Sequence, residues 1–233
     1  VSQASASSWA EFWRPNGSVE LITDRQSELD HLEQTCFDRI DRVQTGHRPS
    51  SAQPAQDIVD TQFGHLIAAA IERDSQLDPW SVLWLESDFL TTRWDAPREL
   101  FALDEDDYGD DEPLDEAELL ERDIETCPQL ERIAAIFDDV CPPQLQLRDA
   151  VHPDLVSSWM SSYGCQVRLV DQLIELLLTS LRADDPYVVL VGTSGFRLGQ
   201  GGWIGHRQGP LRSPDIRLPL LISHAGPLRM PQV

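Results

Sequence analysis

Three segments near the carboxyl end decide the fold: SSYGCQVRLVDQLIELLLTSLR at residues 161–182, YVVLV at residues 187–191 and IRLPLLI at residues 216–222. The second segment has β-branched and aromatic residues without alternation, which is typical of a strand covered on both faces in a parallel sheet. The third resumes as a strand after a glycine-rich loop. The first segment predicts a helix, because its apolar residues recur at steps of three and four: Val167, Val170, Leu173, Ile174, Leu177, Leu178 and Leu181.

A glycine-rich loop follows the predicted strand 187–191. It begins with Gly192-Thr193-Ser194-Gly195, directly beyond the carboxyl end of that strand. Open α/β sheets usually place their ligand sites there, so this loop is the first candidate for a functional site. Tight turns alone explain its further glycines equally well: Gly199, Gly201, Gly202 and Gly205.

Upstream segments repeat the order of helix, turn and strand. We expect a helix near residues 9–13, a turn at Pro15-Asn16-Gly17 and a strand at residues 19–22 that closes in Thr23-Asp24. An amphipathic helix is expected over residues 57–73, started by Asp57, and the apolar run at residues 80–85 predicts a central strand. Residues 25–53 are polar and carry few signals of regular structure.

Later segments add two more predicted helices, at residues 114–125 and 128–140, before a linker at His152-Pro153-Asp154. The pattern as a whole predicts an α/β fold with a mostly parallel sheet and helices on both faces, in a single domain over residues 1–233.

The charge balance excludes two classes of partner. The chain has 40 acidic and 18 basic residues and a formal charge of −22. Nucleic acids and anionic membranes are bound through lysines and arginines that neutralise phosphates, so we predict neither as a partner. Residues 104–125 form an acidic excursion with 13 acidic residues and one arginine. They lack the spacing of an EF-hand, and we interpret them as a solvated loop rather than a calcium site.

Cysteines and targeting signals indicate little. The four cysteines are scattered without metal-ligand spacing, so we expect no cysteine metal site and reduced thiols. No apolar run is long enough to span a bilayer, and the first residues lack the basic start and apolar middle of a signal peptide.

Three segments taken together resemble a known family. They are YGCQVRLVDQLI at residues 163–174, VVLVGTSGFRLG at residues 188–199 and GPLRSPDIRLPLLI at residues 209–222. Their order is similar to the later part of a sulfatase of the alkaline phosphatase superfamily, in which a strand ends in Thr-Ser-Asp-His-Gly or Asp-Asn-Gly and a later segment ends in Arg-x-Pro. The resemblance implies a sulfatase-like three-layer sandwich, truncated here. It also places the chain's early Thr23-Asp24 strand and the segment around Trp94 and Pro97 in the family's order.

The resemblance also implies that catalytic groups are absent. Thr193 stands where the family has a metal-binding aspartate, and Ser194 stands where it has a histidine or asparagine. Gln208 stands near the position of a lysine or histidine that contacts sulfate. Glu86 and Thr91 take the places of histidines, and Phe196 replaces an acidic residue.

Two further parts of the family's machinery do not appear. The nucleophile motif Cys/Ser-x-Pro-x-Arg is not found, which leaves open a fragment that lacks the nucleophile segment. The family uses calcium or magnesium, but neutral side chains hold such cations poorly, so we predict no metal and no cofactor.

Three hypotheses of function remain. The first is a catalytically degenerate sulfatase-like protein that acts by binding an unknown protein partner or a sulfated ligand. The second is an active sulfuric or phosphoric ester hydrolase with replaced parts, in which Ser194 is the nucleophile and His206, Arg207 and Arg212 are candidate anion contacts. The third is an acidic domain whose α/β pattern only coincides with that of the family.

Overall fold

The computed structural model describes residues 8–25, 27, 31–44, 53–101, 136, 139–147, 153–182, 186–206 and 218–223. They form a mixed α/β fold with a small parallel sheet and two antiparallel sheets. In chain order the described elements are α1 (Ser8–Trp13), η2 (Arg14–Asn16), β1 (Ser18–Thr23), α2 (His31–Cys36), β2 (Arg39–Arg42), η3 (Ile58–Asp60), α3 (Gln62–Asp74), β3 (Trp80–Glu86), α4 (Phe89–Thr92), η4 (Arg98–Phe101), β4 (Leu145–Gln146), α7 (Pro153–Ser180), β5 (Val188–Val191), β6 (Arg197–Leu198), β7 (Trp203–Gly205) and β8 (Leu220–Ser223).

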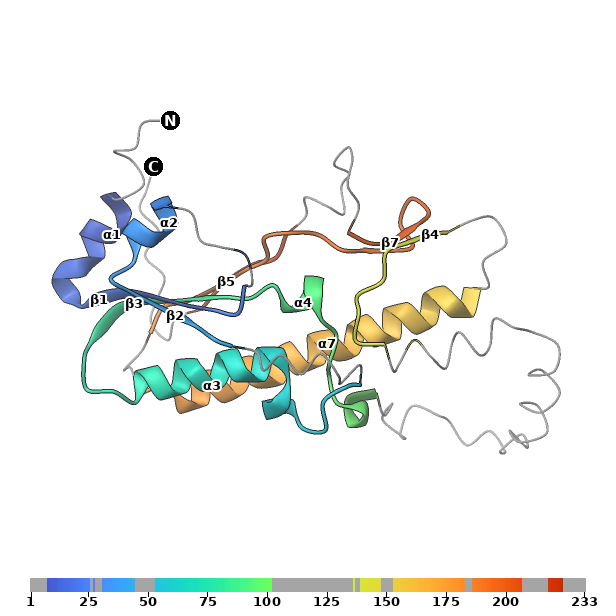
Figure 1. The fold of residues 1–233 in the computed structure, drawn as a ribbon, viewed down its shortest axis with the longest axis horizontal. Helices are drawn as coiled ribbons and strands as arrows, with labels where there is room; N and C mark the ends of the chain where they lie inside the picture. The colour runs from blue at the N-terminus through green and yellow to red at the C-terminus, as the bar shows by residue number, and fades with distance from the viewer. Residues whose placement is uncertain are drawn as a thin grey trace.

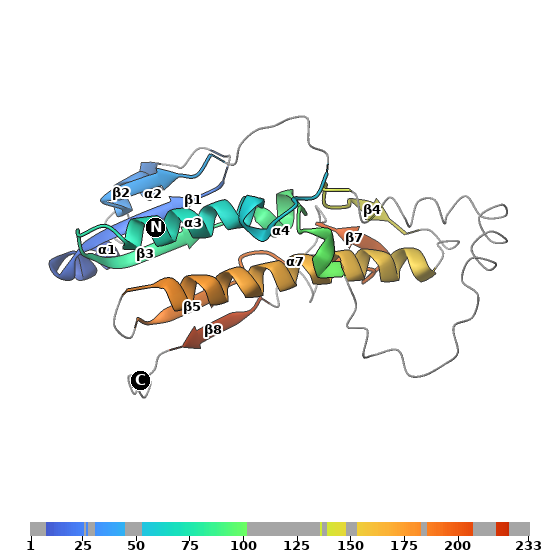
Figure 2. The ribbon, with the colours of Figure 1, turned by 90° about the horizontal axis from the view of Figure 1, so that it is seen from below.

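Helices lie on both sides of the strands β1, β2 and β3. Figure 1 shows α1 and α2 on one side of these strands and α3 and α7 on the other. Figure 2 shows β2, β1 and β3 side by side, with β5 and β8 beyond β3. The arrangement agrees with the α/β class that the sequence predicts.

The parallel sheet has the order β2-β1-β3, and both pairings are parallel. Its middle strand is β1, where Val19, Leu21 and Ile22 are at most 2% exposed. The prediction that residues 80–85 form the central strand is wrong, because β3 is an edge strand among the described residues. An apolar run predicts a buried strand, but it does not predict the position of that strand in the sheet. The position depends on which distant strands pair with it.

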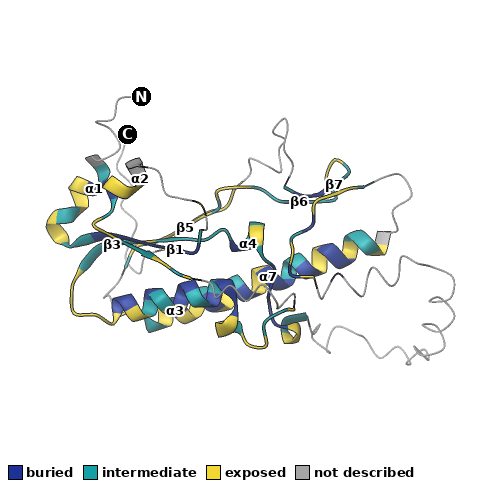
Figure 3. Cartoon of the chain, in the orientation of Figure 1, coloured by how far each residue is buried: buried dark blue, intermediate teal, exposed yellow. Residues whose placement is uncertain are grey.

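The prediction for residues 187–191 is also wrong in part. A strand does form there, but β5 pairs antiparallel with β8 and its side chains are largely exposed (Figure 3). The sheet is therefore not mostly parallel, since β4, β7 and β6 also pair antiparallel. A continuous apolar run does not report strand direction, because both kinds of sheet accept it at this length.

The long helix is extended relative to its prediction. It was expected over residues 161–182 and runs over Pro153–Ser180. The segment predicted as a linker therefore contains the start of α7. Proline is well suited to the first turn of a helix, because the amide hydrogen that it lacks would have no intrahelical acceptor there.

The prediction of one helix over residues 57–73 is wrong at its start, because the segment is divided at the extended residue Thr61 into the 3-10 helix η3 and the helix α3. The Asp57 side chain accepts a hydrogen bond from Val59 N and so starts η3. The Thr61 side chain accepts one from Gly64 N and so starts α3. The predicted turn at residues 15–17 is confirmed by the structure. Gly17 has φ +149°, and a Cβ there would lie 2.8 Å from Ser81 N.

Residues 25–53 gave few signals in the sequence, yet α2 and β2 form there. Their partners come from elsewhere in the chain. Asp38 accepts a hydrogen bond from Val19 N at 3.0 Å, and Ile40 pairs with Leu21. Contacts with distant residues therefore stabilise a helix and a strand that the local sequence does not predict.

Two apolar clusters form the core. The larger joins α3, α7 and the parallel sheet, and its buried members are Ile22, Leu66, Ile67, Ala70, Phe89, Ala96, Leu169, Leu173 and Leu177. The smaller joins the first half of α7 to the glycine-rich loop, and its buried members are Trp94, Ile136, Trp159 and Ile204. The α7 helix contributes to both clusters and so connects the sheet to the loop.

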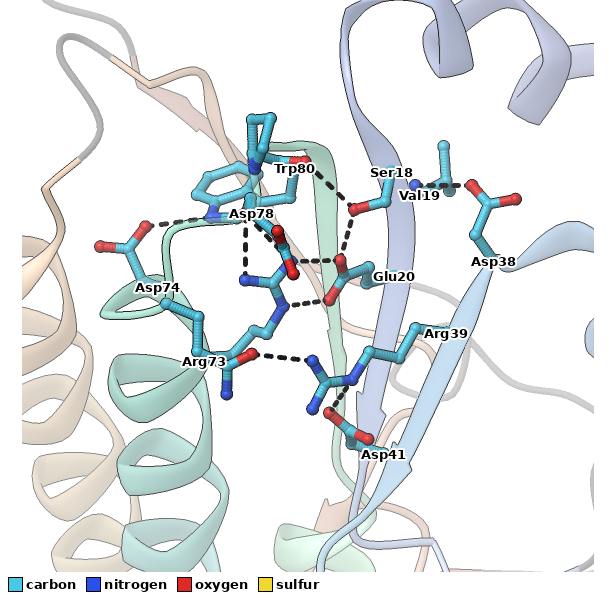
Figure 4. A network of polar contacts seen from close by, with 12 residues as sticks. Ser18, Val19, Glu20, Asp38, Arg39, Asp41, Arg73, Asp74, Asp78 and Trp80 are labelled. Carbon is cyan, nitrogen blue, oxygen red and sulfur yellow. Dashed lines mark hydrogen bonds and ion pairs between the residues drawn. The ribbon is translucent and has the colours of Figure 1, made fainter.

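A polar network lies at the amino end of the parallel strands (Figure 4). Arg73 at the end of α3 donates two hydrogen bonds of 2.5 Å to the Glu20 carboxylate, from Nε and from one terminal nitrogen. Both side chains are 3% exposed. Ser18 Oγ also donates to Glu20. Burial opposes the charge of Glu20, but the bonds from Arg73 and Ser18 outweigh it and lower the pKa of that carboxyl.

A second carboxylate ties three elements together at the same end. Asp74 Oδ1 accepts from Trp80 Nε1 at 3.0 Å, and Asp74 Oδ2 accepts from Arg182 N at 2.7 Å. The end of α3, the start of β3 and the residues just after α7 therefore meet at one side chain; Figure 4 shows its bond with Trp80.

Several predictions fall on residues that the structure does not describe. They concern the acidic excursion at 104–125, the predicted helix at 114–125, most of 128–140, and Cys127. Among the described cysteines Cys36 and Cys165 are buried free thiols and Cys141 is an exposed one. In the ranges that are described, no helix has both the length and the apolar character needed to cross a membrane.

Candidate functional site

The carboxyl end of the parallel sheet brings polar groups together. Asp24 follows β1 directly and is 1% exposed. Its Oδ2 accepts a hydrogen bond from Ser87 Oγ at 2.6 Å, and its Oδ1 accepts one from Asp88 N at 3.1 Å. The two donors come from the turn after β3, so neighbouring strands meet here through a buried carboxylate.

Gln62, the first residue of α3, connects this carboxylate to the next ones. Its Nε2 donates to Asp88 Oδ1 at 3.1 Å, and its backbone N donates to Asp95 Oδ2 at 3.2 Å. The partial positive charge of a helix amino terminus favours acidic groups in these positions. Asp88 and Asp95 therefore lie where the start of α3 stabilises negative charge.

Asp95 is the least satisfied member of the group. It is 3% exposed, and its Oδ2 accepts from Arg93 Nε at 2.7 Å in addition to Gln62 N. Its Oδ1 is buried and has no hydrogen-bond partner among the described residues. An unpaired buried carboxylate oxygen is costly, and protonation of the carboxyl relieves that cost.

A salt bridge forms the rim of the site. Arg25 donates to Glu86 Oε1 at 3.0 Å, and the side chains are 23% and 32% exposed. Thr23 Oγ1 donates to Glu86 Oε2 at 3.4 Å. Glu86 was expected in place of a family histidine, and the structure shows it engaged with the residues that follow β1.

Burial controls the protonation of the two inner carboxyls. It raises the pKa of Asp24, and the bonds from Ser87 and Asp88 N only partly offset this. Burial also raises the pKa of Asp95 despite the neighbouring Arg93. Carboxyls with raised pKa values are able to hold a proton and to exchange it, which is the property of general acids and bases.

The predicted loop after β5 is separate from these contacts. Thr193 and Ser194 are both exposed. Gly192 N, just before them, donates to Pro219 O at 3.0 Å, which attaches the start of the loop to the segment before β8. No hydrogen bond that the structure records joins Thr193 or Ser194 to Asp24, Glu86 or Asp95 in the described part of the chain.

The remaining candidate residues of the loop are described only in part. His206 is half-buried, and its ring meets Phe196 edge-on at a centroid distance of 5.1 Å. Gln208, Arg207 and Arg212 lie outside the described residues. Of the proposed anion contacts, the structure therefore describes only His206.

Phe196, which the resemblance places where sulfatases have an acidic residue, packs against other aromatic rings. Its ring stacks on Tyr163 at 5.3 Å and lies 5.2 Å from Trp94. Trp94 in turn lies 6.0 Å from Trp159. Burial in this cluster raises the pKa of Tyr163. An apolar ring at residue 196 thus fills a core where a carboxylate would be desolvated.

Trp94 and Pro97 make local contacts in the segment that follows β3. Trp94 is 1% exposed, and its Nε1 donates to Leu90 O at 2.9 Å. Pro97 accepts from Leu100 N at 3.1 Å through its carbonyl oxygen. Thr91, expected in place of a histidine, donates its hydroxyl to Asp88 O at 2.8 Å. These contacts stabilise the turn after β3.

The loop does not fit the cation that the resemblance implies. Calcium and magnesium prefer carboxylate and carbonyl oxygens, and Thr193 and Ser194 offer only neutral hydroxyls. Within the described ranges no group of three or more histidine, cysteine or acidic side chains is placed to hold a metal ion. The side chains of Thr193 and Ser194 are therefore a poor match for a catalytic cation.

Sequence reasoning missed most of the carboxyl-end group. The closing of the first strand in Thr23-Asp24 was a signal, but nothing in the local pattern gave Ser87, Gln62 or Asp95 a role. Asp24 and Ser87 are 63 positions apart, and Gln62 and Asp95 are 33 apart. The pairing of β1 with β3 brings Asp24 and Ser87 together, and the start of α3 meets Asp95 in the segment that follows α4.

Comparison of the chain with models of protein families, with curated proteins and with solved structures finds no match. The sulfatase resemblance therefore remains a prediction from the residues.

Proposed function

We propose that this chain is a sulfatase-like protein whose catalytic groups have been replaced and that acts by binding. The observation that carries the proposal is the chemistry of the loop after β5. Thr193 and Ser194 are exposed and neutral, at the positions where the resemblance places a metal-binding aspartate and a histidine or asparagine. We expect the bound molecule to be a protein partner or a sulfated ligand, and we expect no turnover of it.

The proposal includes the finer architecture, a sulfatase-like three-layer sandwich. Its support is the set of helices on both sides of the strands β1 to β3 (Figure 1). The order α7, β5, loop and β8 also follows the order of segments in the family. Under this proposal β5 and β8 continue the layer that β2, β1 and β3 begin.

The chemistry of sulfate ester hydrolysis supports loss of activity. The reaction needs a nucleophile, a metal that polarises the ester, and cationic groups for the charge that develops on the departing sulfate. Thr193 and Ser194 lack the charge to hold the metal. Glu86 carries the wrong charge for contact with an anion and is paired with Arg25.

Titration calorimetry with calcium and with magnesium tests the proposal. An acidic chain binds divalent cations weakly at many places, so wild type is compared with a Thr193→Ala, Ser194→Ala double variant. We expect identical heats. A binding event present in wild type and lost in the double variant would contradict the proposal.

The second candidate is an active hydrolase, and it is favoured by one observation: the Ser194 hydroxyl is exposed and so accessible to a substrate. His206, Arg207 and Arg212 would be its anion contacts. The assay is turnover of an aryl sulfate and an aryl phosphate by wild type, Ser194→Ala and Ser87→Ala. Ser87→Ala is the comparison variant, because the Ser87 hydroxyl lies 2.6 Å from the Asp24 carboxylate and is therefore another serine beside a group that can accept a proton. Turnover abolished only by Ser194→Ala would establish this candidate.

A further inference from the structure

A serine and a buried carboxylate lie side by side at the carboxyl ends of β1 and β3. The two strands are parallel and end together, with Thr23 paired to Glu86. The next residue after β1 is Asp24 and the next after β3 is Ser87, and Ser87 Oγ donates a hydrogen bond of 2.6 Å to Asp24 Oδ2. A hydroxyl within hydrogen-bond distance of a base is the first feature of an activated serine nucleophile.

The second feature is a base that a third group orients. Asp24 Oδ1 accepts a hydrogen bond from Asp88 N at 3.1 Å, so both oxygens of the carboxylate are held. The hydroxyl is held as well, because Phe89 N donates to Ser87 Oγ at 3.1 Å. Among the described residues no other donor contacts this oxygen, so its second lone pair is available to attack an electrophile.

The two side chains differ in exposure. Asp24 is 1% exposed, whereas Ser87 is half-buried at the turn between β3 and α4 (Figure 1). Burial raises the pKa of Asp24, and its hydrogen bonds, the first of them from Ser87, offset this only in part. A carboxylate with a raised pKa is the stronger base, and its hydroxyl partner stays within reach of a substrate.

Acidic side chains around Ser87 limit the class of substrate. Glu86 and Asp88 are its neighbours in the sequence, and Asp24 is its hydrogen-bond partner. Arg25 lies beside them and is paired with Glu86 at 3.0 Å. Three carboxylates outweigh the guanidinium of Arg25 and repel an anion, which disfavours sulfate and phosphate esters. An uncharged carboxylic ester meets no such repulsion.

We propose that Ser87 and Asp24 form a nucleophile–base pair that hydrolyses uncharged carboxylic esters. Ser87 Oγ bonds to the acyl carbon while its proton moves to Asp24 Oδ2, and the alcohol then leaves with that proton as its bond to the acyl carbon breaks. Water next attacks the acyl carbon and gives a proton to Asp24. The carboxylic acid leaves, and the proton returns to Ser87 Oγ. This activity is additional to the proposed binding role, because it uses the end of the parallel sheet and not the loop after β5.

A fluorophosphonate probe tests the nucleophile, because an activated serine displaces its fluoride and forms a stable bond to its phosphorus. The full chain is labelled, and mass spectrometry of its peptides locates the label. We expect it on Ser87 and not on Ser81 or Ser194. Ser81 is the matched control, since it is half-buried on the same strand and its hydroxyl bonds the carbonyl oxygens of Gly17 and Ser18 at 3.0 and 3.2 Å. A label absent from Ser87, or equal on Ser81, would overturn the proposal.

Asp24→Asn tests the base. The variant retains an acceptor oxygen but cannot take up a proton, so we expect labelling of Ser87 to slow by about 100-fold or more. Thermal unfolding establishes that the variant is folded. Labelling at the wild-type rate would mean that Ser87 reacts without the base, and the proposal would fail.

The wild-type chain gives a second measurement that needs no variant. The groups that face Asp24 are the Asp88 carboxylate and the neutral Gln62 amide, in addition to Ser87. We expect the labelling rate to rise with pH through the raised pKa of Asp24, because only the ionised carboxylate accepts the proton. A rate that stays constant from about pH 4 to about pH 7 would overturn the role of Asp24.

Turnover of an uncharged aryl butyrate tests the reaction itself. We expect hydrolysis by wild type and by Ser194→Ala, and loss of hydrolysis in Ser87→Ala. Equal turnover by wild type and Ser87→Ala would overturn the proposal. An aryl sulfate assayed beside it separates this proposal from the hydrolase candidate at Ser194, since that candidate predicts sulfate turnover that only Ser194→Ala abolishes. Either activity can therefore fail without the other.

Discussion

The two ends of the parallel sheet treat buried carboxylates in opposite ways. At the amino end Glu20 faces Arg73 through two short hydrogen bonds, and its pKa is lowered. At the carboxyl end Asp24 and Asp95 have more burial than compensation, and their pKa values are raised. At the amino end the buried carboxylate is fully paired. At the carboxyl end one oxygen of Asp95 has no hydrogen-bond partner among the described residues.

This difference teaches where function can reside in the fold. A fully paired network resists change, because removing one partner leaves a buried charge. Buried polar groups at the carboxyl ends of parallel strands, such as Asp24, lie where α/β proteins hold ligands. The loop after β5, which the sequence singled out, lies instead beside an antiparallel ribbon.

The largest expected effect is at the amino end. Glu20→Ala leaves Arg73 buried without its partner, and we expect the free energy of unfolding to fall by about 3–5 kcal/mol. Asp41→Ala is the matched control, because its ion pair with Arg39 has side chains 43% and 37% exposed. Its loss should cost at most about 1 kcal/mol. Chemical denaturation measures both. Equal costs for the two variants would show that the buried pair is not special.

A smaller effect is expected at the carboxyl end. Asp24→Ala removes the acceptor of Ser87 Oγ and of Asp88 N, and each unsatisfied buried donor costs about 1–3 kcal/mol. Asp24→Asn retains an acceptor oxygen and removes the buried charge, so we expect it to be milder than Asp24→Ala. The free energies of unfolding of the two variants, measured at neutral pH, decide between these outcomes. An asparagine variant as unstable as the alanine variant would mean that the charge itself is needed.

The pH dependence of stability distinguishes the two ends by sign. Asp24 and Asp95 have raised pKa values in the folded state, so their contributions to the free energy of unfolding are largest below the pKa of about 4 in the unfolded chain. These contributions are lost as pH rises through the folded pKa. A lowered folded pKa makes the Glu20 contribution present above about 4.3 and lost as pH falls through the folded pKa. We expect Asp24→Asn to flatten the decline of stability above about pH 4, and Glu20→Gln to flatten the decline below it. Denaturation curves across this range measure both slopes, and slopes of the same sign would refute the contrast.

The smallest effect is expected at the loop. Thr193→Ala and Ser194→Ala change exposed side chains, and each should alter the free energy of unfolding by less than about 0.5 kcal/mol. Thr61→Ala is the matched hydroxyl deletion at a buried helix cap, where the loss should be about 1–2 kcal/mol. Thermal unfolding of the three variants checks the order. A large cost at residue 194 would indicate a contact that the fold does not show.

Predictions from sequence succeeded where the cause is local. The turn at Gly17 depends on residues within a few positions, as does the stripe of α3 that contains Leu66, Ile67 and Ala70. They failed where the cause is distant. The middle position of β1, the edge position of β3 and the antiparallel direction of β5 each depend on a partner strand far along the chain.

The sequence by itself determined the α/β class, the position of β1 and most of α3 and α7, and the neutral side chains of the loop. Periodicity and capping act over one or two turns, so they are visible in a single segment. Only the tertiary structure decided that Asp24, Ser87, Gln62 and Asp95 meet. Strand pairing joins residues dozens of positions apart, and no local pattern specifies which strands pair.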